Sequence, residues 1–431
     1  MSGLAKILLH NGVAVSGSDL NHSAATDALS ALGARVSVPH AAHNIENPEL
    51  VVYTAAIKED NPELVAARQK GVRTIERAVL LGEMMAGYPK AIAVSGTHGK
   101  TSTTSMLAHI LLAAELDPTI TVGGDLDILG GNLRIGGDDY FLAEACEYCR
   151  SFLQFHPFLG IILNVEADHL DYFKDLDDIT DAFGDFAALL PEDGALVYCA
   201  DSPRAEVAAS KTKANAVSFG LQNGDYTAKN ITYNQKGCAG FDVTLRGQTL
   251  FGVQLAVAGE HSILNALAAI AASRALGIPD GAIIKGVESF VGAHRRFEYK
   301  GKCNGATVVD DYAHHPTEIA ATLAAVEKMD IGKLYLVFQP HTYTRTKALF
   351  DEFVQVLSLA DQLIMADIFA AREPDTGLVS SKDVADKVSG AHYFDSFEKI
   401  ADYLRAEAKE GDLIITMGAG DVYKIGEMIV K

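Results

Sequence analysis

The sequence predicts an α/β protein built from three domains. Short apolar runs typical of strands alternate with longer helical patterns in three stretches of the chain. A glycine-rich loop lies between one such run and one such helix, as in phosphate-binding folds. The chain has 431 residues, which is more than one hydrophobic core usually organises. Together these observations favour parallel sheets with helices packed on their faces.

Composition narrows the class of protein. Hydrophobic residues make up 48% and charged residues 21% of the chain, which is typical of a globular protein in water. The net charge of −20 disfavours nucleic acid and anionic membranes as general partners. No apolar run is long enough to span a bilayer, and the first residues lack a signal-peptide pattern. We therefore expect a cytoplasmic protein whose five cysteines are reduced thiols.

The first predicted domain, residues 1–88, alternates short β-rich runs with helical patterns. Strands are predicted at 13–16 and 51–54, and helices at 26–32 and 62–70. This alternation favours a parallel sheet.

The second predicted domain, residues 89–293, begins with a buried strand at 91–95. Residues 225–258 are β-rich with several glycines, which predicts antiparallel strands. An alanine-rich helix is predicted at 262–276. Further buried strands are predicted at 140–143, 160–164 and 195–198.

The third predicted domain, residues 294–431, is again doubly wound α/β. Each of its predicted strands precedes a polar loop and then a helical pattern. These strands are predicted at 307–309, 334–338, 362–365 and 413–416.

The loop Gly96-Thr-His-Gly-Lys-Thr101 has the composition of a phosphate-binding turn. Backbone N–H groups at a helix N-terminus bind phosphate oxygens, and a lysine there reaches the outer phosphates. A following hydroxyl group can bind Mg²⁺, and Thr101 occupies that position. The full eight-residue pattern has a further glycine where this chain has Val94. The alternative is an ordinary strand–helix turn that binds no ligand.

Candidate metal ligands follow two predicted strands. Glu144 comes directly after the strand at 140–143, and the strand at 160–164 continues into a segment that contains His169. Carboxyl ends of parallel strands meet at one sheet edge, where ligands bind in open α/β folds. Taken singly, each residue is explained equally well as a loop carboxylate or a capping histidine. Their convergence beside a phosphate loop favours an Mg²⁺ site.

The third domain supplies cationic side chains. Arg295 and Arg296 are adjacent at the predicted domain junction, and His341 and Arg345 follow the strand at 334–338. Arginine binds carboxylate and phosphate groups in a bidentate manner. A pair of surface arginines is usually only solvated, so their position at a sheet edge carries the interpretation.

Seven motifs in this order resemble the Mur ligases of peptidoglycan synthesis, and the resemblance covers essentially the whole chain. The lack of the first glycine at Val94 is shared with that family. The motifs are Gly96-Thr-His-Gly-Lys-Thr, Asn164-Val-Glu-Ala-Asp-His-Leu-Asp, Gly259-Glu-His-Ser-Ile-Leu-Asn-Ala, His294-Arg-Arg-Phe, Asp310-Asp-Tyr-Ala-His-His-Pro, Gln339-Pro-His-Thr-Tyr-Thr-Arg and Met417-Gly-Ala-Gly-Asp.

The resemblance implies a fold and a reaction. The fold is an incomplete Rossmann-like UDP-binding domain, a central P-loop-type ATPase domain with added antiparallel strands, and a C-terminal Rossmann-like ligase domain. ATP, with Mg²⁺, phosphorylates the lactyl carboxylate of UDP-N-acetylmuramic acid, and the amine of L-alanine attacks the acyl phosphate. A monomer or homodimer is expected.

The resemblance also implies roles for individual residues. Catalytic roles are expected for Lys100, His169, His315 and Arg345. The ATP-binding residues are expected to be Gly96, Thr97, His98, Gly99, Lys100, Thr101, Ser102, Asn265, Arg296 and Asp311. The metal ligands are expected to be Thr101, Glu144 and His169. Contacts to the UDP substrate and the amino acid are expected from Ser16, Asp19, Thr54, Ala55, Arg295, His341 and Arg345.

Three features depart from the family pattern. The chain starts at a pentapeptide that resembles the beginning of the family's first helix, so we expect that the true start lies upstream and that this chain binds the UDP substrate poorly. Cys146 and Cys149 stand where many relatives have aspartates. A zinc or redox role for them is disfavoured because no second cysteine pair exists, and loop packing is expected. Thr342 replaces an arginine of many relatives.

Other functions stay open at the level of sequence. A murein-peptide recycling ligase would load a whole peptide on the same acceptor, but the stretch 339–345 looks more like alanine-adding members of the family. A folylpolyglutamate synthase fits less well. A non-catalytic nucleotide-binding regulator is the alternative from another class. The presence of Lys100, Glu144, His169 and Arg345 argues against it, because a regulator needs no acceptor residues.

Overall fold

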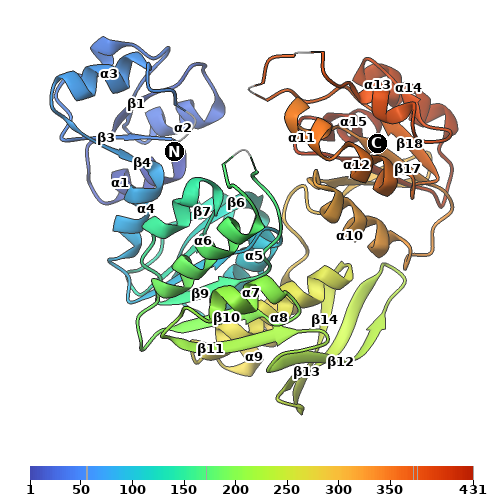
Figure 1. Cartoon of the computed structure of the whole chain (residues 1–431), viewed down its shortest axis with the longest axis horizontal. Coiled ribbons are helices and arrows are strands. Elements are labelled where there is room, and N and C mark those ends of the chain that lie inside the picture. Colours follow the sequence, from blue (N-terminus) through green and yellow to red (C-terminus); the bar gives the residue numbers. More distant parts are fainter. Residues whose placement is uncertain (55–56, 171, 372, 376, 431) are drawn as a thin grey trace. The chain divides into compact units, whose positions relative to one another are not determined.

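The computed structural model describes residues 1–54, 57–170, 172–371, 373–375 and 377–430 (Figure 1). The chain forms two compact units. One contains residues 1–123, 127–226 and 268–283, and the other contains residues 124–126, 227–267 and 284 onward. Both have sheets with helices on their faces, which confirms the predicted α/β class. Among the described residues, no helix is both long enough and apolar enough to cross a membrane.

The N-terminal region contains two separate two-stranded parallel sheets, β1–β2 and β3–β4. The strand predicted at 13–16 is wrong except for its last residue, because Gly12 and Val13 close the C-terminus of α1 by donating to Leu9 and Leu8 carbonyls. The elements are α1 (Ser2–His10), β1 (Ser16–Ser18), α2 (Ala24–Ala31), β2 (Arg35–Ser37), β3 (Leu50–Tyr53), α3 (Pro62–Gln69), β4 (Arg73–Glu76) and α4 (Arg77–Met85).

The central sheet of the first unit has the strand order β11-β10-β9-β5-β8-β6-β7, with β5 in the middle. Strands β8, β9, β10 and β11 run parallel as neighbours of one another or of β5. Apolar side chains on one face of this sheet pack against α4, α6 and α7, whereas α5 contacts β5 and β8. The elements are β5 (Lys90–Ser95), α5 (Lys100–Ala113), β6 (Thr119–Leu126), β7 (Gly131–Arg134), β8 (Tyr140–Glu144), β9 (Leu159–Ile162), α6 (Leu176–Ala188), β10 (Ala195–Cys199), α7 (Pro203–Ala209) and β11 (Asn215–Gly220).

The segment predicted to be antiparallel forms three long strands. In the second unit β12, β13 and β14 follow one another, and β13 pairs antiparallel with β14. The alanine-rich helix is present as α8. These elements are β12 (Tyr226–Tyr233), β13 (Cys238–Leu245), β14 (Gln248–Ala258), α8 (Glu260–Ala275) and α9 (Asp280–Ser289).

The C-terminal sheet has the order β15-β16-β20-β17-β18-β19, and only the β15–β16 pair is antiparallel among its described pairings. One face packs against α10, α12 and α13, and the other against α14 and α15, so the sheet is doubly wound as predicted. The elements are β15 (Glu298–Cys303), β16 (Ala306–Asp311), α10 (Pro316–Val326), β17 (Leu334–Phe338), α11 (Tyr343–Ala348), α12 (Phe350–Leu357), β18 (Gln362–Met365), α13 (Ser381–Ala385), β19 (His392–Tyr393), α14 (Phe397–Glu407), β20 (Leu413–Met417) and α15 (Tyr423–Ile429).

Candidate active site

The predicted phosphate loop connects the carboxyl end of β5 to the first turn of α5, which places Lys100, Thr101 and Ser102 at the helix N-terminus. Two of its glycines are required by geometry. Gly96 has φ 142°, and a Cβ there would lie 2.8 Å from the Leu163 Cβ atom. Gly99 has φ 86° in the left-handed region and forms the N-cap of α5. The loop therefore presents backbone N–H groups beside the positive end of the helix dipole.

The segment that follows β9 makes several hydrogen bonds to this loop. The Asn164 side chain accepts a hydrogen bond from the His98 N–H at 2.8 Å and donates one to the His98 carbonyl at 3.1 Å. The Thr97 N–H donates to the Asn164 carbonyl, and the Thr97 hydroxyl accepts from the Glu166 N–H. The imidazole of His98 lies 3.5 Å from a Glu166 oxygen. These contacts tie the loop to the segment that follows β9.

Lys100 is the first residue of α5, and its side chain is paired with a buried carboxylate. Its Nζ atom lies 2.9 and 3.1 Å from the two oxygens of Glu147, and it also donates to the carbonyls of Gly96 and Thr97. The Glu147 side chain is 3% exposed. Burial lowers the pKa of the Lys100 ammonium, but the charges of Glu147, Cys146 and Glu144 and the hydrogen bond to Glu147 together outweigh that effect, and the pKa is raised overall. Lys100 is therefore a stable cation.

Thr101 and Glu144 lie together, as the sequence predicts for metal ligands. The Thr101 hydroxyl donates to one Glu144 oxygen at 3.2 Å, and the Gly123 N–H donates to the other at 2.5 Å. A Cβ at position 123 would lie 2.8 Å from a Glu144 oxygen, so a glycine here lets the carboxylate approach the backbone closely. A hydroxyl and a carboxylate oxygen beside a phosphate loop are the hard donors that Mg²⁺ prefers.

His169 occupies a strained turn after β9, with φ 53°. Its ring packs on Tyr148 with centroids 4.7 Å apart, and its Nε2 atom lies 3.7 Å from an Asp168 oxygen. Within the described residues, no group of three or more His, Cys, Asp and Glu side chains is arranged to hold a metal ion. The metal-binding role of His169 thus stays a prediction.

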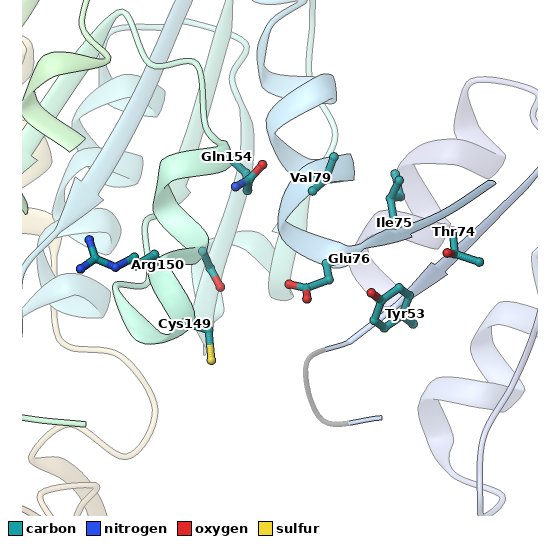
Figure 2. A pocket seen from close by; sticks show the side chains of 9 residues that line it. Tyr53, Thr74, Ile75, Glu76, Val79, Cys149, Arg150 and Gln154 are labelled. Atoms are coloured by element: carbon teal, nitrogen blue, oxygen red, sulfur yellow. The ribbon is translucent and has the colours of Figure 1, made fainter. Parts of the chain in front are cut away.

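A pocket of about 420 Å³ lies at the carboxyl ends of β3 and β4 (Figure 2). Tyr53 and Glu76, which are partners in the β3–β4 register, point into it from one side. The opposite side is the 3₁₀ segment η3 (Tyr148–Gln154), which contributes Cys149 and Gln154. Arg150 lines the pocket, but its guanidinium points away and pairs with Asp178. The pocket thus offers mostly neutral hydrogen-bonding groups.

Substrate contacts predicted in the N-terminal region lie at or near strand ends. Ser16 opens β1, and Asp19 follows it, with its N–H donating to the Ser37 carbonyl. Thr54 follows β3 directly beside the pocket-lining Tyr53. Ala55 lies outside the described residues. The substrate-binding roles of these residues stay predictions.

In the second unit, Arg295 makes several contacts with residues of the C-terminal domain. Its Nε atom donates to Asp310 at 3.0 Å, and another nitrogen donates to the Gly418 carbonyl at 2.7 Å. The guanidinium also lies over the rings of Tyr312 and Tyr423. Asp310 is completely buried. Burial raises its pKa, and the Thr416 hydroxyl and the Arg295 charge oppose that shift. These contacts fit a structural residue, and the substrate-binding role of Arg295 stays a prediction.

Arg296 and Asp311 lie near the N-terminus of α10. Arg296 is 3.8 Å from Glu318, and Asp311 accepts hydrogen bonds from the Ala313 N–H and the Thr322 hydroxyl. Burial raises the pKa of Asp311 to about 6. Asn265, the other ATP-binding residue predicted in this unit, is buried in α8.

A histidine cluster adjoins this end of α10. The ring of His314 is 5.8 Å from that of His341, whose Nδ1 atom lies 3.4 Å from Arg345. Burial, together with the charges of His314 and Arg345, lowers the pKa of His341 to about 4. Thr342 has φ 65°, which is strained for a β-branched residue. His315 caps α10, with its Nδ1 atom accepting from the Thr317 N–H.

Sequence reasoning missed several residues that hold these sites together. In the sequence, Glu147 is indistinguishable from an ordinary loop carboxylate, and only the fold brings it to Lys100. Glu318 reaches back to accept from the N–H groups of His314 and His315. Its position three residues after His315 is a capping-box signal that the sequence already carried.

Nucleotide-dependent α/β enzymes typically combine a glycine-rich loop with a lysine at a helix N-terminus, neighbouring hydroxyl and carboxylate oxygens, and a pocket at strand ends. The described part of this chain has all three features. The family-model comparison agrees, with matches to the Mur ligase family catalytic domain at residues 1–89, the Mur ligase middle domain at 94–273 and the Mur ligase glutamate ligase domain at 295–420. The chain belongs to the Mur ligase family.

Individual relatives make the resemblance more specific. The chain is 52% identical over 435 residues to the UDP-N-acetylmuramate–L-alanine ligase of Clostridium botulinum strain Langeland, covering 100% of this chain and 95% of the relative. It is 53% identical over 439 residues to the ligase of the same name from Clostridium beijerinckii, with the same coverage. The crystal structure of UDP-N-acetylmuramate–alanine ligase from Thermotoga maritima matches with a TM-score of 0.84 at 28% identity, over 100% of this chain and 95% of that one. A murein peptide ligase from Psychrobacter arcticus matches with a TM-score of 0.73 at 27% identity and the same coverage.

Proposed function

We propose that this chain is an ATP-dependent ligase that joins L-alanine to the lactyl carboxylate of UDP-N-acetylmuramic acid in peptidoglycan precursor synthesis. The observation that carries this function is the full-length identity of about half to enzymes named for that reaction. The phosphate loop with Lys100 and the Thr101–Glu144 pair supply the groups that such a reaction needs.

The chemistry follows from the electrophile. A carboxylate is a poor acyl donor at neutral pH, so its oxygen first takes the γ-phosphoryl group of ATP, and ADP leaves. The amine of L-alanine then attacks the carbonyl carbon of the acyl phosphate. A proton leaves the nitrogen, inorganic phosphate departs and an amide forms. Energy from ATP is thereby conserved in the new bond.

The chain's own residues bind, orient and neutralise charge in this scheme. The loop N–H groups and Lys100 hold the outer phosphates of ATP. Their positive charge offsets the repulsion between these phosphates and the lactyl carboxylate of the substrate. Arg345, beside His341, is suited to the carboxylate of the incoming amino acid. Because His341 has a pKa near 4, its imidazole is neutral at physiological pH.

Mg²⁺ fits the oxygen donors of Thr101 and Glu144, and it supplies charge neutralisation at the phosphates when bound. The pocket at the ends of β3 and β4 is our candidate position for a neutral part of the UDP-sugar. Its hydroxyl, amide and carboxylate lining suits a polyhydroxylated ring better than a phosphate.

The test is amide formation by the purified chain. ATP, Mg²⁺, UDP-N-acetylmuramic acid and L-alanine are mixed, and phosphate release and the alanylated product are measured together. We expect both in equal amounts, and neither when L-alanine is omitted. Product formed only when a murein peptide replaces L-alanine would contradict the proposal and favour a recycling ligase. ATP binding without any product would favour a non-catalytic regulator.

A further inference from the structure

The lysine of the phosphate loop makes a full set of hydrogen bonds to oxygens of the chain itself. An ammonium group has three hydrogens, and the Lys100 Nζ atom already has four oxygens within hydrogen-bonding distance. Two of these are carbonyls of its own loop, and two belong to Glu147. A phosphate oxygen can reach this lysine only by displacing one of them.

Glu147 is held in place by backbone contacts on both sides. The Ala145 N–H donates to the Val94 carbonyl of β5, which ties the segment to the central sheet. The Phe152 N–H donates to the Cys146 carbonyl, and the Phe152 ring stacks on that of Phe186 in the core. The carboxylate therefore stays beside the loop, and the flexible lysine is the partner that moves.

The buried charge of Glu147 affects how favourably a nucleotide can bind near Lys100. A Glu147 carboxylate that is 3% exposed has little water to solvate it when Lys100 turns toward a phosphate. The phosphates bring further negative charge to the same place. Both effects oppose nucleotide binding, and both favour the return of Lys100 to Glu147 when the nucleotide leaves.

We infer that Glu147 is a positioning residue that competes with the nucleotide phosphates for Lys100 and thereby sets nucleotide affinity and release. The inference rests on the proposed use of ATP and goes beyond it. An enzyme that turns over must release ADP, whose β-phosphate is within reach of the loop lysine. Recapture of Lys100 by Glu147 lowers the barrier to that release.

Glu147→Gln separates this role from a merely structural one by the sign of its effect. Glutamine keeps the shape and one acceptor but removes the charge, so the resting pair is weakened and the bound state loses its repulsion. We expect ADP and ATP to bind about fivefold more tightly or better, and ADP to dissociate more slowly by a similar factor. Loss of a structural contact would instead weaken binding.

The measurements are calorimetric affinities for ADP, ATP and AMP in the presence of Mg²⁺, and stopped-flow dissociation of ADP from the full chain. AMP is a matched ligand, because it lacks the outer phosphates and its affinity is expected to stay unchanged. Glu192→Gln, at an exposed position, removes the same charge elsewhere in the domain and is expected to bind ADP as the wild type does. Glu147→Asp keeps the charge, and its ADP affinity is expected to be nearer to wild type than that of the glutamine variant.

Unchanged or weaker ADP binding by Glu147→Gln overturns the inference, as does an equal gain in AMP affinity. The outcome is separable from that of the proposed function. If the affinities change as expected but neither protein forms the amide, the ligase proposal fails and the inference stands. If the wild type forms the amide and the variant binds ADP identically, the inference fails and the ligase proposal stands.

Discussion

Two buried ion pairs hold a cation next to a sheet edge in this protein, and they differ in what surrounds the cation. The Lys100–Glu147 pair has its closest N···O distance at 2.9 Å and the Arg295–Asp310 pair at 3.0 Å. The carboxylates are 3% and 0% exposed. Distance and burial alone do not distinguish the two pairs.

The neighbours of the two cations do distinguish them. Arg295 is planar, lies over two tyrosine rings and donates to Gly418, so its position is determined from several directions. Lys100 is a point charge on a flexible stem, held by Glu147 and two carbonyls of the predicted phosphate loop. The comparison indicates that the Arg295–Asp310 pair is a lasting structural contact, whereas we infer that the Lys100–Glu147 pair is exchanged for contacts with a ligand. Each of the following experiments tests one side of it.

Lys100→Ala has the largest expected effect. It removes the cation that we propose holds the ATP phosphates, and loss of one such group typically lowers kcat roughly 10²–10³-fold. Amide formation and phosphate release under saturating substrates measure the loss, and circular dichroism checks the fold. Turnover within tenfold of wild type would show that the loop N–H groups suffice.

Asp310→Ala breaks the Arg295–Asp310 pair. The Arg295 guanidinium then loses its carboxylate inside the domain, which typically costs about 3–5 kcal/mol of stability. Because the chain has more than one unit, hydrogen exchange at the amides of β16 and β20 is a better measure than a single melting temperature. Unchanged protection of those strands would mean that the tyrosine rings and Gly418 hold Arg295 without the carboxylate.

Asp311→Asn tests a buried carboxyl whose pKa is raised by burial even though the charge of Arg296 opposes that shift. Its pKa is raised from 3.8 to about 6 in the folded chain, so the folded state keeps the proton longer than the unfolded state. Stability is therefore lost as pH rises from about 4 through 6, by up to about 3 kcal/mol.

The asparagine variant lacks this loss, so its stability relative to wild type should rise between pH 4 and pH 7. Urea unfolding at several pH values, followed in the C-terminal domain, measures the difference. His341, whose lowered pKa acts in the opposite direction, is present in both proteins and cancels. A difference that is constant with pH would contradict the raised pKa.

Lys382→Ala has the smallest expected effect. Lys382 and Asp386 are 3.1 Å apart, nearly as close as the buried pairs, but both side chains are 62% exposed. Pairs of this kind contribute less than about 0.5 kcal/mol because water and salt screen them. Chemical unfolding at low and high salt measures the change. A loss of stability as large as that for Asp310→Ala would show that burial does not decide how much an ion pair contributes to stability.

Local features of the active site were predictable from sequence, whereas its supports were not. Gly96, Gly99, Lys100 and Thr101 lie within six residues, and their spacing encodes a turn that enters a helix. Asn164, which braces that turn, comes 66 residues after His98, and no local pattern relates the two. The resemblance to the Mur ligases brought the segment of Asn164 forward as a motif but did not say what it contacts.

The strand predicted at 13–16 is a case in which a local pattern predicted an element that the structure does not form there. Val13 and Val15 have the apolar, β-branched character of a strand, but the helix before them uses the Val13 N–H for its own termination. Hydrogen bonding to β2 therefore begins only at Val15, whose carbonyl accepts from the Arg35 N–H.

The sequence by itself determined the α/β class, the family, the phosphate loop and the placement of Glu144 at a strand end, because these depend on periodicity and on residues close together in the chain. Only the tertiary structure decided which carboxylate faces Lys100, that Arg295 is enclosed by Asp310 and two tyrosines, and that β3, β4 and η3 line one pocket. The physical reason is that charge pairing and burial depend on distances in space, which separation along the chain does not set.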